Sequence, residues 1–356
     1  MKKVHNFSAG PSILPAEVIQ QTASAIQEFD GMGLSILEIS HRSKNFEKVV
    51  EEARQSVKEI LNLPDRFEVL FLQGGATLGF HMAAMNFMKE GGSAVYANTG
   101  VWASGAIKEA KLLGQVDVPF DSSGSNHNHI PEVAFKGNYD YAHYTSNNTI
   151  YGTQYHATPP SEVPLICDMS SDIFSRPVDA AAHALIYAGA QKNLGPAGAT
   201  LYIVDKEKLG QTGRKLPIYM DLKAHIEKDS MYNTPPVLSI YTCMLTLRWI
   251  KSMGGLVGME KRNNDKQTLF YNELDRNSLF HGHAVKEARS WMNPTFRLND
   301  DSMTAEFDAM WKAAGVSGIA GHRSVGGYRA SMYNALPIES VQVLVDVMKE
   351  FERVKG

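Results

Sequence analysis

The stretch ALIYAGAQKNLGPAGATLYIVD, residues 184–205, contains two short apolar runs separated by a glycine-rich turn. The second run, TLYIVD, begins at residue 200. Lysines are mostly exposed on charged surfaces, whereas Lys192 stands where an apolar run gives way to glycine and proline. The stretch therefore predicts two strands of one sheet, with a lysine just beyond the end of the first.

Four further runs show the same pattern along the chain. They are FEVLFL (67–72), SAVYAN (93–98), YDYAHYT (139–145) and VPLIC (163–167). Each ends in a glycine-rich or polar turn, and helix-like segments follow several of them. A repeated order of strand, turn and helix predicts an α/β domain with a mostly parallel central sheet.

The C-terminal third of the chain has a different character. VLSIYTCMLTLRWIKSMGG (237–255) predicts a helix, with prolines before its start and glycines at its end. From about residue 260 a charged segment leads to shorter strands and helices, with WMNPTFRL as one strand. We expect a large domain over residues 16–260 and a smaller α/β domain formed by residues 1–15 and 261–356.

Composition excludes several classes of function. The 356 residues carry a formal net charge of −3 without a basic block, which argues against a nucleic-acid surface. The two cysteines cannot form a disulfide framework, and no cysteine–histidine pair has zinc spacing, so we expect no metal site. No apolar run is long enough to span a membrane, and the first residues do not resemble a signal peptide. We therefore expect a cytoplasmic protein.

Two side chains at the expected strand ends suit a pyridine cofactor. Lys192 and Asp168 each follow an apolar run. A buried amine has a lowered pKa and can form a Schiff base, and a buried carboxylate needs a cationic partner such as a protonated pyridine nitrogen. Pyridoxal phosphate (PLP) needs both groups. A surface lysine and a turn-starting aspartate are the simpler alternatives for each residue taken alone.

A phosphate site is expected where a strand gives way to a helix. In QGGATLGF (73–80), two glycines allow a close backbone approach, and the amides of Ala76 and Thr77 would point from the helix start. NTPP offers a second place, because Asn233 and Thr234 precede another helix. Taken singly, a glycine pair after a strand is more often only a tight turn.

Trp102 is a large aromatic side chain in NTGVWASG, which we expect to be a polar, glycine-flanked turn. A core tryptophan would more naturally lie within a strand. In a turn at a strand end, its flat ring suits stacking on a cofactor ring.

The tripeptide HRS occurs twice, in SHRSKNF (41–43 for HRS) and in GHRSVGGYRAS. The cationic residues around the two copies are His41, Arg42, His322, Arg323 and Arg329. Arginine binds carboxylate and phosphate through a planar fork of donors, so this set predicts a substrate with at least two anionic groups. Solvated surface arginines are the alternative, but no acidic residue lies within either motif to pair them.

Six motifs occur in a characteristic order along the chain: NFSAGPSILP, SHRSKNF, QGGATLGF, YAGAQKNLGPAG, NTPP and GHRSVGGYRASMYNA. In this order and at these separations the chain resembles the phosphoserine aminotransferase family, which belongs to the fold-type-I, class-V PLP-dependent aminotransferases. The resemblance runs over essentially the whole chain. It implies the fold of that class, with a large PLP-binding domain and a smaller C-terminal domain.

The resemblance implies a role for each matching residue at the cofactor. Lys192 would hold PLP as a covalent Schiff base and shuttle the proton, and Asp168 would hold the pyridine nitrogen. Trp102 would stack on the ring, and Thr149 would lie near its phenolic oxygen. The expected contacts to the phosphate are Ala76, Thr77, Gln191, Asn233 and Thr234. The last two would come from the other subunit, which implies a homodimer with shared active sites.

The resemblance also implies the substrates, L-glutamate and 3-phosphohydroxypyruvate. Amino transfer between them would give 2-oxoglutarate and O-phospho-L-serine in L-serine biosynthesis. Arg329 resembles the clamp for the α-carboxylate, and the other HRS residues resemble the pocket for the distal phosphate or carboxylate. A second role on 4-phosphohydroxythreonine in pyridoxine biosynthesis is an alternative that the resemblance leaves open.

One position departs from part of the family. Some members carry arginine where this chain has Thr77, so we expect phosphate binding to depend more on Arg42 and Arg323. The segment QVDVPFDSSGSNHNHIP (115–131) has no assigned role. The rival interpretations are another aminotransferase of the class, of the alanine–glyoxylate or serine–pyruvate type, and a nucleotide- or sugar-phosphate-binding protein without PLP. The second lacks the glycine motifs of such proteins.

Overall fold

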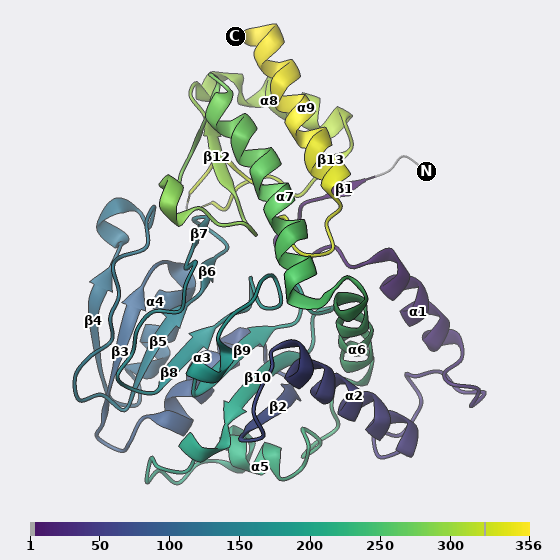
Figure 1. The fold of residues 1–356 in the computed structure, drawn as a ribbon, viewed down its shortest axis with the longest axis vertical. Helices are drawn as coiled ribbons and strands as arrows, with labels where there is room; N and C mark the ends of the chain where they lie inside the picture. The colour runs from purple at the N-terminus through teal and green to yellow at the C-terminus, as the bar shows by residue number, and fades with distance from the viewer. Residues whose placement is uncertain (1–3, 324) are drawn as a thin grey trace.

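Figure 1 shows the computed structural model, which describes residues 4–323 and 325–356. A large unit surrounds the central sheet, and a smaller unit lies above it in this view. The long helix α7 leads from one to the other.

The large unit contains a seven-stranded sheet. Its strands are β2 (Phe67–Leu72), β3 (Ser93–Asn98), β4 (Gln115–Asp121), β5 (Tyr141–Thr145), β8 (Leu165–Asp168), β9 (Leu185–Gly189) and β10 (Thr200–Asp205). Their order is β2-β10-β9-β8-β5-β3-β4. β10 is antiparallel to both of its neighbours, and the other pairs are parallel. The predicted mostly parallel sheet is confirmed, and β4 comes from the segment to which the sequence assigned no role.

Helices cover both faces of this sheet because its strands are apolar on both sides. Val69 and Phe71 of β2 point into one hydrophobic cluster, whereas Leu70 and Leu72 point into another. The first cluster includes residues of α1 (Ala16–Gln27), α2 (Lys44–Ile60) and α6 (Val237–Ser252). The second includes residues of α3 (Gly75–Phe87), α4 (Val101–Ala110) and the short α5 (Leu222–Ile226).

Helix α2 shows how the sequence specifies one of these layers. The Ser43 side chain accepts a hydrogen bond from the Phe46 amide at 3.3 Å, which caps the helix at its start. Buried residues then recur at helical spacing, at Phe46, Val49, Val50, Ala53 and Val57. This apolar stripe packs towards the sheet, and the charged residues between face solvent.

The smaller unit has its own hydrophobic cluster, which includes Phe7 from the N-terminal segment. Its helices are α7 (Gly255–Arg276), α8 (Thr304–Ala313) and α9 (Ile338–Lys355). One sheet contains β11 (Phe280–Gly282), β12 (Thr295–Leu298) and β14 (Tyr328–Arg329), and a second pairs β1 (His5–Asn6) with β13 (Val316–Ser317). A further small sheet pairs β6 (Asn147–Asn148) with β7 (Thr153–Gln154). Helix α7 runs across the predicted boundary at residue 260, so the division into domains stays a prediction.

The topology of the sheet determines where ligands can bind. β2 and β9 are each antiparallel to β10, so they run in the same direction as one another. The carboxyl ends of β2, β9, β8, β5 and β3 therefore lie along one edge. In open α/β sheets this edge is where ligands bind.

Candidate active site

A cavity of about 350 Å³ opens at this edge of the sheet. Its wall combines residues that follow β2, β3, β8 and β9 with residues of the smaller unit. The sequence-predicted residues that line it are Ala76, Thr77, Trp102, Thr149, Asp168, Gln191, Lys192, His322 and Arg329. Segments far apart in the sequence thus meet at one place.

Lys192 lies in the turn that follows β9, as the sequence predicted. Its Nζ donates a hydrogen bond to Thr149 Oγ1 at 3.0 Å. Burial lowers the pKa of the amine from 10.5 to about 8; the nearby Asp168 carboxylate opposes this shift, and the Arg329 charge adds to it. A neutral amine is therefore accessible near neutral pH, as a nucleophile or a proton acceptor requires.

Asp168 is the last residue of β8 and is only 4% exposed. Its Oδ1 accepts a hydrogen bond from the Ser170 amide at 2.9 Å. Burial raises the pKa of this carboxyl, while hydrogen bonds with Ser170 and the nearby Lys192 amine act in the opposite direction. A carboxylate that is buried at a cavity wall is stabilised by a cationic ligand group, because an unpaired buried charge is costly.

Helix α3 begins at the cavity, directly after β2. Gly74 and Gly75 have positive φ angles of 101° and 66°, which glycine adopts without strain. At Gly74 an added Cβ would lie 2.4 Å from a side-chain carbon of Leu78, so a larger residue would not fit. Ala76 and Thr77 then occupy the first turn, where amides lack acceptors within the helix and can bind an anion.

Trp102 lines the cavity, but the expected turn around it is wrong. Helix α4 begins at Val101, so Trp102 belongs to its first turn. Gly100, with φ of 154°, makes the sharp change from strand to helix. The Trp102 side chain is 39% exposed, and it also borders a neighbouring groove. Its flat ring is therefore available to a ligand.

Arg329 brings a guanidinium from β14 into the cavity wall. One of its terminal nitrogens donates to the main-chain oxygen of Thr149 at 3.3 Å. Its Nε is buried without a hydrogen-bond partner among the described residues. Burial lowers the pKa of this group from its usual value, yet guanidinium stays charged. Arg329 lines the same cavity as Lys192, so its planar fork of donors suits a carboxylate of a bound substrate.

Five predicted site residues do not line this cavity. They are His41, Arg42, Asn233, Thr234 and Arg323. His41 is half-buried, and the other four are exposed. The Asn233 side chain donates to Gln73 Oε1 at 3.3 Å. Ser324 of the second HRS lies outside the described residues.

The N-terminal segment is a part of the site for which the sequence predicted no role. Ala9 and Gly10 line the cavity. Ser12 Oγ donates to the main-chain oxygen of Lys192 at 2.6 Å, and a Cβ on Gly10 would lie 3.5 Å from the Lys192 side chain. The sequence signal for this part of the site was the motif NFSAGPSILP. It resembles the family, but none of its residues was assigned a role.

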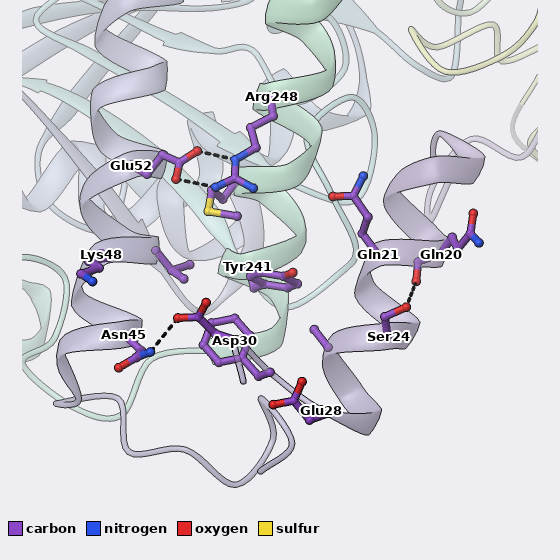
Figure 2. Close-up of a pocket in the computed structure, with 14 residues that line it drawn as sticks. Gln20, Gln21, Ser24, Glu28, Asp30, Asn45, Lys48, Glu52, Tyr241 and Arg248 are labelled. Atoms are coloured by element: carbon purple, nitrogen blue, oxygen red, sulfur yellow. Dashed lines mark hydrogen bonds and ion pairs between the residues drawn. The ribbon is translucent and has the colours of Figure 1, made fainter. Parts of the chain in front are cut away.

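A second hollow, of about 670 Å³, lies between α1, α2 and α6 (Figure 2). Carboxylates gather there, and Arg248 is paired with Glu52 through two hydrogen bonds, one of them 2.7 Å long. Asn45 donates to Asp30 at 2.7 Å. The lysine and the aspartate that line this hollow, Lys48 and Asp30, are both exposed. The hollow therefore lacks the pair of buried groups found in the cavity at the sheet edge.

Comparison with known proteins agrees with this geometry. A model of the class-V aminotransferases matches residues 4–344. The chain is 58% identical over 354 residues to the phosphoserine aminotransferase of Flavobacterium psychrophilum, with 99% of each chain covered. The chain belongs to the phosphoserine aminotransferase family. The resemblance of the six sequence motifs to this family is therefore confirmed.

Solved structures of phosphoserine aminotransferases share the whole fold. The enzyme from Bacillus circulans subsp. alkalophilus is 43% identical, with a TM-score of 0.96 over 100% of both chains. The PLP-bound enzyme from Trichomonas vaginalis is 34% identical, with a TM-score of 0.92 over 98% of this chain and all of that one. Members of the family are PLP-dependent transaminases. In the part of this chain that the structure describes, no helix is long and apolar enough to cross a membrane.

Proposed function

We propose that this enzyme transfers an amino group between L-glutamate and 3-phosphohydroxypyruvate, giving 2-oxoglutarate and O-phospho-L-serine. The observation that carries the proposal is one cavity that is lined by the Lys192 amine, with its lowered pKa, by the buried Asp168 carboxylate and by the Arg329 guanidinium. Membership of the family supplies the substrates. We place the reaction in the cytoplasm, since both cysteines are free and buried.

The residues present fit PLP at each of its functional groups. Lys192 would hold the aldehyde carbon, and Asp168 would pair with the pyridine nitrogen. The start of α3, with Ala76 and Thr77, and the neighbouring Gln191 would receive the phosphate. Trp102 and Thr149 would contact the ring. When bound, PLP supplies an electron sink for the carbanion formed at the amino acid's Cα.

The chain's own residues then bind and transfer a proton. Arg329 binds the carboxylate beside the reacting carbon, which both amino acids share. Lys192, released as a neutral amine, takes the Cα proton, because its pKa of about 8 keeps a substantial neutral fraction at physiological pH. The Thr149 hydroxyl accepts a hydrogen bond from this amine at 3.0 Å, which positions the amine before the proton transfer. His322, whose pKa is lowered first by burial and then by Arg329 and Arg323, lines the same cavity as Arg329.

A homodimer would complete the site. His41, Arg42, Asn233 and Thr234 do not line the cavity of their own chain, and three of the four are exposed. We propose that they reach the cavity of a second copy, where Asn233 and Thr234 would contact the cofactor phosphate. His41 and Arg42 would bind the distal anion of the substrate.

Spectroscopy tests the reaction directly. Purified protein with PLP should show a visible band that L-glutamate and O-phospho-L-serine bleach and L-alanine does not. Lys192→Ala should remove the band and turnover, whereas Lys136→Ala, at a side chain 69% exposed, should retain both. Bleaching by L-alanine alone would overturn the substrate, and a missing band in the wild-type protein would overturn the cofactor.

Mixed dimers test the shared site. Lys192→Ala and Arg42→Ala chains are each expected to be inactive alone. If Arg42 serves the partner's cavity, each mixed dimer has one site with both defects and one intact site. Random pairing should then restore about a quarter of wild-type activity. Mixed dimers that form without regaining activity would contradict the arrangement.

A further inference from the structure

The N-terminal segment passes the cavity on its way from the smaller unit to the large one, and the proposed reaction gives it no role. In the smaller unit β1 pairs with β13, and Phe7 belongs to the hydrophobic cluster. Helix α1, which begins at Ala16, packs in the large unit (Figure 1). Between these two elements, Ala9 and Gly10 form part of the cavity wall. Residues 8–15 therefore connect the two units beside the site.

Tyr333, between β14 and α9, fixes the start of this segment to the smaller unit. Its fully buried phenol donates to the main-chain oxygen of Ala9 at 2.7 Å. The phenol oxygen itself accepts from Asn293 Nδ2 at 3.2 Å. Two residues before Ala9, the main-chain oxygen of Phe7 accepts from the Ser331 amide at 3.3 Å. The segment is thus held on the smaller-unit side of the cavity.

Ser12 fixes the other end of the segment to the turn that carries Lys192. Its amide donates to the main-chain oxygen of Gln191 at 2.9 Å, and its Oγ donates to the main-chain oxygen of Lys192 at 2.6 Å. The Ile13 carbonyl is a second acceptor for the hydroxyl, but at 3.5 Å it lies at the limit of hydrogen bonding. A hydroxyl has one proton, so the closer Lys192 carbonyl receives it. Ser12 therefore binds two successive carbonyls of this turn.

Gly10 lies between the two anchors and alongside the Lys192 side chain. A Cβ on Gly10 would lie 3.5 Å from Lys192 Cγ and 3.7 Å from its Cε. The main chain at Gly10 therefore occupies space beside the aliphatic part of this lysine that water would otherwise fill. Burial is the largest cause of the lowered pKa of the amine, about 8. The segment contributes to that burial.

We propose that Ser12 is a positioning residue for Lys192: its hydrogen bond to the Lys192 carbonyl holds residues 9–12 against the lysine side chain and keeps the amine away from water. The inference rests on the proposed role of this amine in the reaction. Without the hydroxyl, the Lys192 carbonyl loses a partner, and the segment gains freedom between Ala9 and Ser12. Water can then reach the amine, and hydration favours the ammonium form.

Ser12→Ala should therefore raise the midpoint of the Lys192 titration. The expected rise is about half a pH unit, a fraction of the difference between about 8 and the ordinary 10.5. The ionisable groups that line the cavity or act on this amine stay in place in the variant: Asp168, Asp172, His322 and Arg329. A rise would thus report a loss of burial and not a change of charge.

Acetylation of the apoprotein with trace acetic anhydride, followed by mass spectrometry of the peptide that contains Lys192, measures this midpoint. Ser12→Thr keeps the hydroxyl and should give the wild-type value. The control Ser161→Ala removes a half-buried serine hydroxyl that donates to the Val163 carbonyl, also at 2.6 Å. It should leave the midpoint unchanged. If Ser12→Ala yields too little folded protein, Ser12→Cys, whose thiol is a weaker donor, carries the test.

Turnover gives a second readout in the PLP-loaded enzyme. A rise of about half a unit lowers the neutral fraction of Lys192 at pH 7 by about threefold, so kcat of Ser12→Ala should fall by about threefold there. At about pH 9.5 the amine is mostly neutral in both proteins, and the two kcat values should agree. KM for both substrates should stay within about twofold, because Arg329 is unchanged. A general structural defect would instead lower kcat at every pH, and that result would contradict the proposal.

The acetylation has two results that would overturn the proposal. One is an unchanged or lowered Lys192 midpoint in Ser12→Ala, or in Ser12→Cys where that variant carries the test. The other is an equal rise in Ser12→Thr or Ser161→Ala, because the hydroxyl of Ser12 would then not be the cause. Failure of the proposed function would appear elsewhere, as a wild-type protein that shows no response to L-glutamate, and it would leave the apoprotein midpoints readable.

Discussion

Raising the pH should convert Lys192 to its neutral amine with a midpoint near 8. The structure lowers its pKa from 10.5 to about 8, and 10.5 − 8 is 2.5 units. At pH 7 about one molecule in ten then carries the neutral amine, against about one in three thousand for a lysine at its ordinary pKa. The neutral fraction at pH 7 is therefore about 300-fold larger than in water.

Burial is the main cause of this shift, and neighbouring charges modify it in opposite directions. Asp168→Asn removes a carboxylate that favours the ammonium, so the midpoint should fall below that of the wild type. Arg329→Gln removes a cation that disfavours it, so the midpoint should rise. An electrostatic cause shifts the Lys192 midpoint in opposite directions in the two variants. A general loosening of the cavity would shift it in the same direction in both.

Acetylation of the apoprotein with trace acetic anhydride between pH 6 and 10 gives the assay. The yield at Lys192 is read by mass spectrometry, and the chain unfolded in urea supplies the reference for a solvated amine. A folded-state midpoint near 10.4, equal to that reference, would refute the reasoning. Equal shifts in both variants would refute the assignment to Asp168 and Arg329.

Three further outcomes are expected. Asp168→Asn should lower kcat by about 100-fold or more while the chain stays folded, because the amide lacks the charge that a pyridinium needs; stopped-flow rates with circular dichroism measure this. Arg329→Lys should lower kcat/KM of both half-reactions about 10- to 100-fold, because a point charge replaces a planar fork; a loss in only one half-reaction would contradict a shared carboxylate clamp. Gly152→Ala should destabilise the fold by about 2–4 kcal/mol in urea unfolding, since φ is +73° and the Cβ would lie 2.5 Å from Thr295 Oγ1. Gly31→Ala, with φ of +69° and nothing within 4 Å, should cost only about 1 kcal/mol.

The strands and the chemistry at their ends were predictable because they depend on local signals. The runs 67–72, 93–98 and 200–205 form strands with the predicted bounds. A short, unbroken run of apolar residues is typical of a strand that is buried on both faces. The position of Lys192 just after β9 follows from the same signal.

Other features depend on contacts that no local signal contains. The sequence grouped Arg323 with Arg329, yet only Arg329 reaches the cavity. A turn in which the amides of Val325 and Gly326 both bond to the His322 carbonyl separates them. Trp102 looked like a turn residue because Gly100, two residues before it, lies between the end of β3 and the start of α4.

The contact between the Tyr333 phenol and the Ala9 carbonyl joins positions 324 residues apart. During synthesis the early residues and Lys192 leave the ribosome long before Tyr333 does. A nascent chain can therefore build most of the central sheet, but it cannot place His322 and Arg329 in the cavity wall until translation is almost complete. Premature termination before this point should release chains that lack a finished active site, whatever the stability of their sheet.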